Sequence, residues 1–265
     1  MIPVRNTEPL IAPTQLMKSL ILSICLGIFF ASTLLPNVAS AQLKKVLDKV
    51  STATGGTVNP SPTEMAMGLK EALEKGTGQG IDRLNLENGF LGNPAIKLPF
   101  PEEAIQVERS LRKIGLGNLC DQLITSINRA AEDAVKEARP LFTQAIKEMT
   151  FKDVQSILLG SERAATDYLQ HSTTAGLKVK FAPPIQASLQ KVGATAHWES
   201  VMTRYNKIPL VKPVNTDLIA YVTDKALQGL FVEIAKEELA LRKNSNLRSS
   251  PLLQKVFGFA DAQKK

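Results

Sequence analysis

Three polar side chains near the middle of the chain lie close enough in sequence to do chemistry together: Asn128, Arg129 and Glu132. Apolar residues recur around them at helical spacing, which predicts a helix over about 118–138. The three residues could face a ligand-binding cleft. Alternatively, Arg129 and Glu132 each pair with an opposite charge four residues later, and Asn128 anchors two packed helices. The alanines among them favour the second interpretation, because small side chains let another helix approach closely.

A second polar pair, Glu238 and Arg242, is spaced by about one helical turn. It lies in the longest predicted helix, about 216–243, at the edge of an apolar stripe. A partly buried ion pair fits this position better than a general acid does. Glu237 adds a second carboxylate, but adjacent helical side chains diverge by about 100°. The two carboxylates are therefore poorly placed to act as an acid–base pair.

Two aromatic residues are candidates for the wall of a binding site. Tyr168 follows a Gly-Ser turn and either lines a pocket or lies in the core with its hydroxyl group hydrogen-bonded. Trp198 and Tyr205 are seven residues apart, on one face of a predicted helix. They form either a stripe in the core or a platform for a ligand, and the core interpretation is the simpler one.

Groups that commonly carry catalysis are scarce. The two histidines, His171 and His197, have no cysteine or carboxylate at the spacing of a metal site. No Gly-x-Ser-x-Gly turn is present. The Gly-x-Gly-x-Gly run from Gly76 follows a predicted helix instead of a strand, which argues against a phosphate-binding loop. Cys120 lies on an apolar stripe and is expected to be a buried, unreactive thiol. We therefore expect no metal and no cofactor.

The N-terminal region has the pattern of an export signal. A lysine precedes an almost unbroken apolar run over 19–35, and Ala39-Ser40-Ala41 has the small-x-small pattern of a signal-peptidase site. Cleavage there would leave Gln42 first and place the protein in the periplasm. The alternative is an uncleaved N-terminal anchor, since the apolar run approaches spanning length.

Cleavage would change the charge and the chemistry of the chain. It removes Arg5, Lys18 and Glu8, which lowers the formal charge from +7 to +6, and it also removes Cys25. Cys120 then has no partner for an internal disulfide. The modest, dispersed positive charge suits an envelope protein or an anionic membrane surface as the partner. Neither nucleic acid nor a transmembrane span is expected after cleavage.

The rest of the chain predicts an all-α fold, a single compact domain of about 8–10 helices. A short irregular or extended segment is expected near 88–101. Helix ends are predicted at the glycine run and at Pro183-Pro184. Residues 1–16 are expected to be a misassigned start or a disordered extension, and residues 17–41 the signal peptide. A short helix and linker over 42–62 should lead into the helical domain, 63–258. Residues 259–265 are expected to form a disordered tail.

Several blocks of sequence resemble one known family. They are Asn128-Arg129-Ala130-Ala131-Glu132, Ile157-Leu158-Leu159-Gly160, Ala165-Thr166-Asp167-Tyr168-Leu169, Tyr221-Val222-Thr223-Asp224-Lys225-Ala226-Leu227, Gly229-Leu230-Phe231 and Leu252-Leu253-Gln254-Lys255-Val256-Phe257-Gly258. Together they resemble the bacterial exported family DUF4197, a domain of unknown function, from about Gln42 to Gly258. The resemblance implies a mostly helical, exported protein and supplies no activity, ligand or catalytic residue. The family tends to have Asn-Pro where this chain has Asn244-Ser245, which puts only the turn after the long helix in doubt.

Two functions are compatible with these observations. The first is a non-catalytic helical periplasmic protein that binds a partner at the cell envelope. The second is a carrier or enzyme whose cleft holds a small or lipid-like molecule. The candidate cleft residues are Asn128, Arg129, Glu132, Tyr168, Trp198, Glu238 and Arg242. The second function needs such residues to converge on one cavity, whereas the first does not.

Overall fold

A computed structural model describes residues 59–191, 193–206 and 217–263, without the side chains of Glu103, His197, Ser200, Val201, Arg204 and Tyr205. The predicted signal peptide and most of the predicted linker after it lie outside the described residues. The predicted pairing of Trp198 with Tyr205 also falls outside them.

The described residues form helices joined by short turns, with no β-strand among them, and this confirms the predicted all-α fold. The α-helices are α2 (Pro62–Leu84), α3 (Ile105–Lys113), α4 (Gly117–Ala134), α5 (Ala138–Glu148), α6 (Phe151–Leu158), α7 (Ala164–Lys191), α8 (Ala194–Asn206), α9 (Leu218–Lys243) and α10 (Pro251–Gln263). Single 3-10 turns lie at Glu102–Ala104, Val135–Glu137 and Ser245–Leu247.

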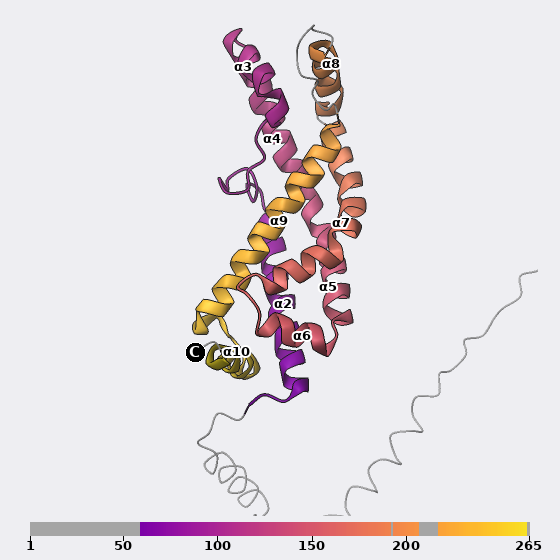
Figure 1. Ribbon diagram of the computed structural model, residues 1–265. Helices are drawn as coiled ribbons and strands as arrows, with labels where there is room; N and C mark the ends of the chain where they lie inside the picture. The colour runs from indigo at the N-terminus through magenta and orange to yellow at the C-terminus, as the bar shows by residue number, and fades with distance from the viewer. Residues whose placement is uncertain (1–58, 192, 207–216, 264–265) are drawn as a thin grey trace, which may run out of the picture. The chain divides into compact units, whose positions relative to one another are not determined.

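Helix α9 is central to this helical unit. Helices α2, α4 and α7 pack against it, and α5 packs against both α2 and α7. Figure 1 shows α3 and α8 at one end of the unit, and α6 and α10 at the other. The irregular segment over 85–101 connects α2 to the single turn before α3. The two ends of the unit are therefore built from different helices.

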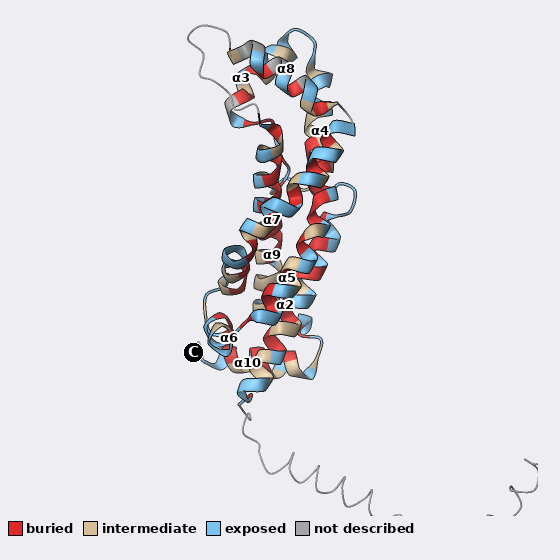
Figure 2. Ribbon diagram, turned by 90° about the vertical axis from the view of Figure 1, so that its right-hand side faces the viewer, coloured by how far each residue is buried: buried red, intermediate tan, exposed pale blue. Residues whose placement is uncertain are grey.

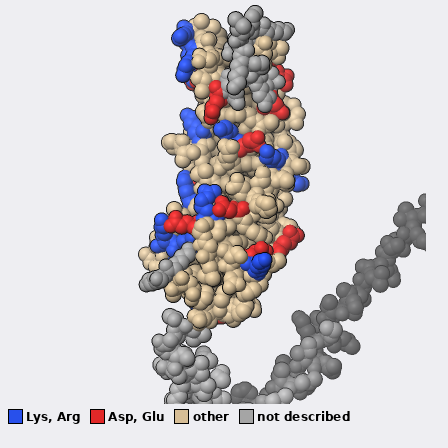
Figure 3. Space-filling view, viewed as in Figure 1, with Lys and Arg blue, Asp and Glu red and all other residues tan. Residues whose placement is uncertain are grey.

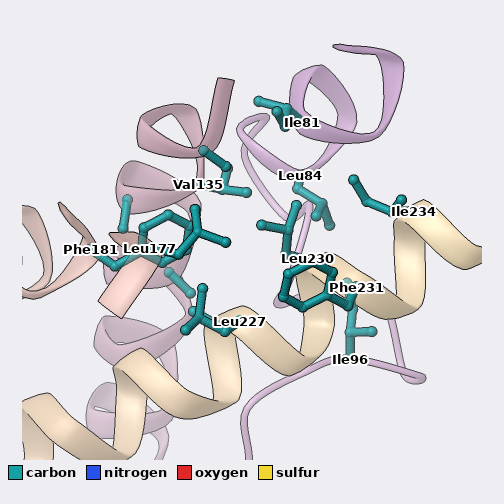
Figure 4. Packing of buried hydrophobic residues seen from close by; sticks show 14 of the residues in the cluster. Ile81, Leu84, Ile96, Val135, Leu177, Phe181, Leu227, Leu230, Phe231 and Ile234 are labelled. Atoms are coloured by element: carbon teal, nitrogen blue, oxygen red, sulfur yellow. The ribbon is translucent and has the colours of Figure 1, made fainter. Parts of the chain in front are cut away.

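The core lies on the inner faces of these helices, where buried residues form continuous stripes (Figure 2). Side chains of α2, α7 and α9 meet there, and Ile96 of the irregular segment joins them (Figure 4). The rings of Phe142 in α5 and Phe231 in α9 are tilted by 57°, with centroids 6.0 Å apart, a favourable geometry for an aromatic pair. The stripe predicted along α9 is buried at Val222, Ala226, Leu230 and Ile234.

Residues that were predicted to end helices lie inside them. Helix α7 runs through Pro183 and Pro184 as one helix of 28 residues, although an interior proline removes a backbone hydrogen bond. The buried residues Phe181 and Ile185 continue its inner face across the prolines, so that packing outweighs the loss. Helix α2 likewise continues through its glycines to Leu84, because that stretch packs against α5 and α9.

The ends of two other helices show how local sequence sets the boundaries. The hydroxyl of Thr150 accepts a hydrogen bond from the Asp153 N–H at 3.2 Å, and the Asp153 carboxylate accepts one from the Thr150 N–H at 2.8 Å. This reciprocal cap starts α6 at Phe151. Helix α10, by contrast, extends to Gln263, because Phe257 and Ala260 are buried. The prediction of a disordered tail from residue 259 therefore does not hold over the described part of that tail.

Candidate functional site

Asn128 fixes the irregular segment 85–101 to α4. Its side chain is fully buried. Oδ1 accepts a hydrogen bond from the backbone N–H of Leu98 at 2.9 Å, and Nδ2 donates to the carbonyl of Leu98 at 2.9 Å. Nδ2 also donates to the Ile124 carbonyl at 2.7 Å. The amide thus pairs with the Leu98 backbone as a neighbouring strand would, and both of its donor hydrogens are used.

Glu132, about one turn further along α4, holds the start of the same segment. Its Oε1 accepts hydrogen bonds from the backbone N–H groups of Phe90 at 3.0 Å and Leu91 at 3.2 Å. Arg129 donates to Oε2 of Glu132 at 2.5 Å and to Glu87 at 2.9 Å. The buried carboxylate is therefore both paired and hydrogen-bonded, as a charge removed from water must be. The Arg129–Glu132 pair within α4, together with Glu87 and the backbone of segment 85–101, takes the place of the pairs predicted four residues later along the helix.

The segment also contacts α9. The Tyr221 hydroxyl donates to the carbonyl of Pro99 at 3.1 Å. The Phe90 ring is fully buried against Gly229, where a Cβ atom would lie 2.6 Å from the ring. Segment 85–101 is thus held on one side by the polar residues of α4 and on the other by α9. The polar residues of α4 form a clamp, not an open cleft.

Glu238 and Arg242 form the buried ion pair that their spacing predicts. Arg242 Nη2 lies 2.8 Å from Glu238 Oε1, and the side chains are 8% and 7% exposed. Glu238 also accepts hydrogen bonds from the N–H groups of Ala165 at 3.0 Å and Thr166 at 2.8 Å, in the first turn of α7. Arg242 donates to the last two carbonyls of α6, at 2.8 and 3.2 Å.

This pair completes two helix ends at once. The carboxylate lies at the positive end of α7 and the guanidinium at the negative end of α6, so each charge opposes a helix dipole. Each also satisfies backbone groups that have no partner within their own helix. A cavity of about 120 Å³ borders the pair, between α2, α9 and α10. Because both charged groups are engaged with backbone, this cavity offers no free acid or base from them.

Tyr168 packs against α5 as a partly buried core residue. Its hydroxyl donates to the Ala145 carbonyl at 3.4 Å. Burial raises the pKa of Tyr168, and the negative charges of Asp153 and Glu148 raise it further. A phenol of raised pKa stays protonated at neutral pH and is a poor general base.

An apolar pocket of about 220 Å³ lies between α3, α4 and α8, at the end drawn uppermost in Figure 1. Its volume exceeds the roughly 150 Å³ of an engineered cavity that binds benzene. It is smaller than the roughly 300–1,000 Å³ of sites for drug-sized ligands. The walls are apolar apart from Gln122 and Ser126 and include Phe100, Leu111, Leu123, Cys120, Trp198 and Met202. The pocket therefore has room for one apolar group.

Trp198 contributes its ring to this pocket wall. Its side chain is 3% exposed, and its ring lies 5.5 Å from that of Phe100, tilted by 57°. Nε1 of Trp198 is buried and has no hydrogen-bond partner among the described residues, a costly state for a donor. Cys120 adds a buried thiol whose pKa is raised by burial, so the thiol is uncharged at neutral pH.

The structure divides the predicted cleft residues among separate places. Asn128, Arg129 and Glu132 come together at segment 85–101, Glu238 and Arg242 come together at the ends of α6 and α7, and Tyr168 lies against α5. Only Trp198 lines the apolar pocket. The pocket itself was not predicted. The sequence gives little signal for it, because the leucines around Cys120 fit one apolar helical stripe of the kind that a core helix has.

The described part of the chain contains neither a metal-binding cluster nor a helix that could span a membrane. No three His, Cys, Asp or Glu side chains there gather in a way that could hold a metal ion. None of the described helices combines the length and the apolar character needed to cross a membrane.

Comparison with known proteins places the chain by family. The sequence model of DUF4197, described as a protein of unknown function, matches residues 59–258. This range covers most of the chain and agrees with the resemblance noted above, although it begins after Gln42. No curated protein matches the chain, and no solved structure does. The chain therefore belongs to the DUF4197 family.

Proposed function

We propose that the protein is a non-catalytic binding protein of the cell envelope, and that the pocket between α3, α4 and α8 receives the end of an acyl chain. The observation that carries this proposal is the apolar pocket itself, whose walls include the buried ring of Trp198. The other candidate polar groups support the non-catalytic part. Their hydrogen bonds go to backbone groups, as in Asn128, Glu132, Glu238 and Arg242.

An acyl chain fits the chemistry of the pocket walls. Each methylene transferred from water into the pocket contributes about 0.8 kcal/mol. Lengthening the chain by one methylene therefore tightens binding about fourfold until the pocket is full. The polar side chains of Gln122 and Ser126 belong to the same walls.

A series of straight-chain fatty acids tests the proposal by calorimetric titration of the purified protein. Affinity should rise with each methylene and then level off once the chain outgrows the pocket. The ligand should be recovered unchanged, as mass spectrometry would show. A flat affinity series would contradict acyl binding. Turnover of the ligand would contradict the non-catalytic role, and selective binding of apolar peptides instead would identify a protein partner.

Pocket variants make the test specific. Ala194→Leu narrows the pocket and should shorten the chain length at which affinity levels off, whereas Met202→Ala widens it and should lengthen that limit. Ala187→Leu, on an exposed face of α7, is the matched control and should leave the series unchanged. Thermal melting of each variant separates pocket effects from loss of the fold.

The envelope location rests on the predicted export signal. Its apolar run and Ala39-Ser40-Ala41 support cleavage before Gln42. The mass of the protein recovered from the periplasm tests this part, and an intact N-terminus on cytoplasmic protein would refute it.

A further inference from the structure

We infer that the corner between α3 and α4, residues 109–119, docks the protein on an anionic lipid surface. This α3–α4 corner exposes two large apolar side chains: Ile114 is 70% exposed and Leu119 is 54% exposed. Leu116, between them, is 40% exposed. Three such residues within six positions are more than scattered surface apolar residues usually give, and they mark an interaction site.

The backbone holds these side chains in a fixed turn. Gly115 has φ of +81°, a conformation that favours glycine. The N–H of Leu116 donates to the Leu111 carbonyl at 2.9 Å, and the N–H of Gly115 donates to the Arg112 carbonyl at 3.2 Å. These two bonds form a Schellman motif, which ends α3. The corner therefore presents Ile114 on a well-defined turn instead of burying it.

The positive charge of the α3–α4 corner indicates that its partner is anionic. Residues 109–119 contain three cations and no carboxylate, and Figure 3 shows Lys and Arg side chains over the outer side of α3. Arg112 is paired with Glu108 and Asp121, each at 2.8 Å. Arg109 and Lys113 make no ion pair with any side chain that the structure describes. Apolar side chains beside free cations suit a surface that has a hydrocarbon layer beneath anionic headgroups.

The start of α4 adds a second attraction for phosphate groups. Helix α4 begins at Gly117 and has no side-chain cap. Its first N–H groups and the positive end of its dipole therefore lie at the α3–α4 corner, where they favour an anion. The apolar pocket shares Leu119 with the corner, so a lipid acyl chain would reach the pocket from the side that docks. The step in which a lipid of the docked surface supplies the acyl chain rests on the proposed function.

Vesicle flotation tests the inference with purified protein. Vesicles of phosphatidylglycerol and phosphatidylcholine in equal amounts should carry the protein upward, and pure phosphatidylcholine vesicles should carry much less. Added salt should weaken the binding, since exposed charges are screened. Ile114→Ser should lower vesicle affinity by about tenfold or more. Val179→Ser is the matched control, because Val179 is 71% exposed on α7 and lies outside the corner.

The cations have a control of their own. Arg109→Gln combined with Lys113→Gln should weaken binding by about fivefold for each charge removed. Lys152→Gln combined with Lys180→Gln removes two exposed cations from α6 and α7 and should have a much smaller effect. Circular dichroism and melting curves confirm that each variant is folded.

Three results would overturn the inference: no flotation of the wild-type protein, equal binding to neutral and anionic vesicles, or equal loss in Ile114→Ser and Val179→Ser. A dimer that Ile114→Ser dissociates, without vesicle binding, would instead assign the corner to a second copy of the chain. The proposed function is tested separately by monomeric fatty acids. Ile114 does not line the pocket, so Ile114→Ser should leave their affinity unchanged.

Discussion

At the scale of single residues, several buried charged side chains of this protein bind backbone groups that would otherwise lack a hydrogen-bond partner. Glu238 caps the start of α7, Arg242 caps the end of α6, and Glu132 binds the backbone of segment 85–101. Buried Arg248 does the same at the end of α9, where it donates to the Leu241 and Arg242 carbonyls. Such residues resemble a catalytic set in the sequence, because they are polar and lie beside apolar stripes. Their partners identify them as structural.

Glu238 and Glu237 allow a direct comparison of neighbouring carboxylates. Glu238→Gln leaves the buried guanidinium of Arg242 without its counter-charge and should cost about 3–5 kcal/mol of unfolding free energy. Glu237→Gln breaks a pair with Arg83, whose side chain is 47% exposed, and should cost about 1 kcal/mol or less. Chemical denaturation measures both. Equal losses in the two variants would refute the capping role assigned to Glu238.

At the scale of elements, the packing of segment 85–101 depends on a close approach to α9. Gly229→Ala would place a Cβ atom 2.6 Å from the Phe90 ring and 3.3 Å from Ile96 Cβ. The Phe90 ring is fully buried, so it cannot move aside freely. Overpacking of this kind should lower the unfolding free energy by about 1–3 kcal/mol.

Gly258→Ala is the matched control for that substitution. Gly258 lies inside α10, and a Cβ atom there meets nothing within 4 Å. The helix preference for alanine should then raise the unfolding free energy by about 0.5–1 kcal/mol. If denaturation showed the same change for both glycines, the close packing of Phe90 on α9 would be disproved.

The joint between α2 and α10 predicts a pH dependence. Glu64 accepts a hydrogen bond from Lys255 at 2.7 Å, and this bond, with those from the Ser61 backbone and hydroxyl, lowers the pKa of Glu64 to about 2. Since the folded pKa is depressed, the stabilisation is present above the ordinary value of 4.5 and is lost as the pH falls from about 4.5 toward 2.

Denaturation midpoints measured across that pH range test this joint. Glu64→Gln should flatten the acid side of the stability profile, and Lys255→Gln should do the same by removing the largest cause of the shift. An unchanged acid slope in Glu64→Gln would show that the joint does not hold in solution.

At the scale of the whole molecule, the sequence predicts the helices better than it predicts how they pack against one another. Periodicity identifies the all-α class, the stripe of α9 and the Glu238–Arg242 pair, because these depend on spacing along one helix. Pro183 and Pro184 mislead, since packing of α7 on α4 and α9 decides that helix's length. The apolar pocket also escapes prediction. The leucines near Cys120 have the spacing of core residues. The positions of α3 and α8 leave part of the apolar face of α4 uncovered, and this part lines the pocket.

Function is accordingly expected at the end of the unit formed by α3, α4 and α8. The candidate polar residues of α4 and α9 are engaged in a clamp and in helix caps, whereas this end has an apolar pocket and exposed apolar side chains. We expect variants of the clamp and cap residues to lower the free energy of unfolding. Variants of the pocket should change binding without comparable loss of stability.

Quenching of Trp198 fluorescence by an acyl chain that carries a terminal bromine tests directly whether such a chain occupies the pocket between α3, α4 and α8. Trp198 is the only tryptophan in the chain, so the emission reports on this pocket wall alone, and bromine quenches it only at close contact. Occupation of the pocket should give saturable quenching that is relieved by the unbrominated acid and is weak in Ala194→Leu. Binding of the brominated chain without quenching, or equal quenching in Ala194→Leu and Ala187→Leu, would contradict it.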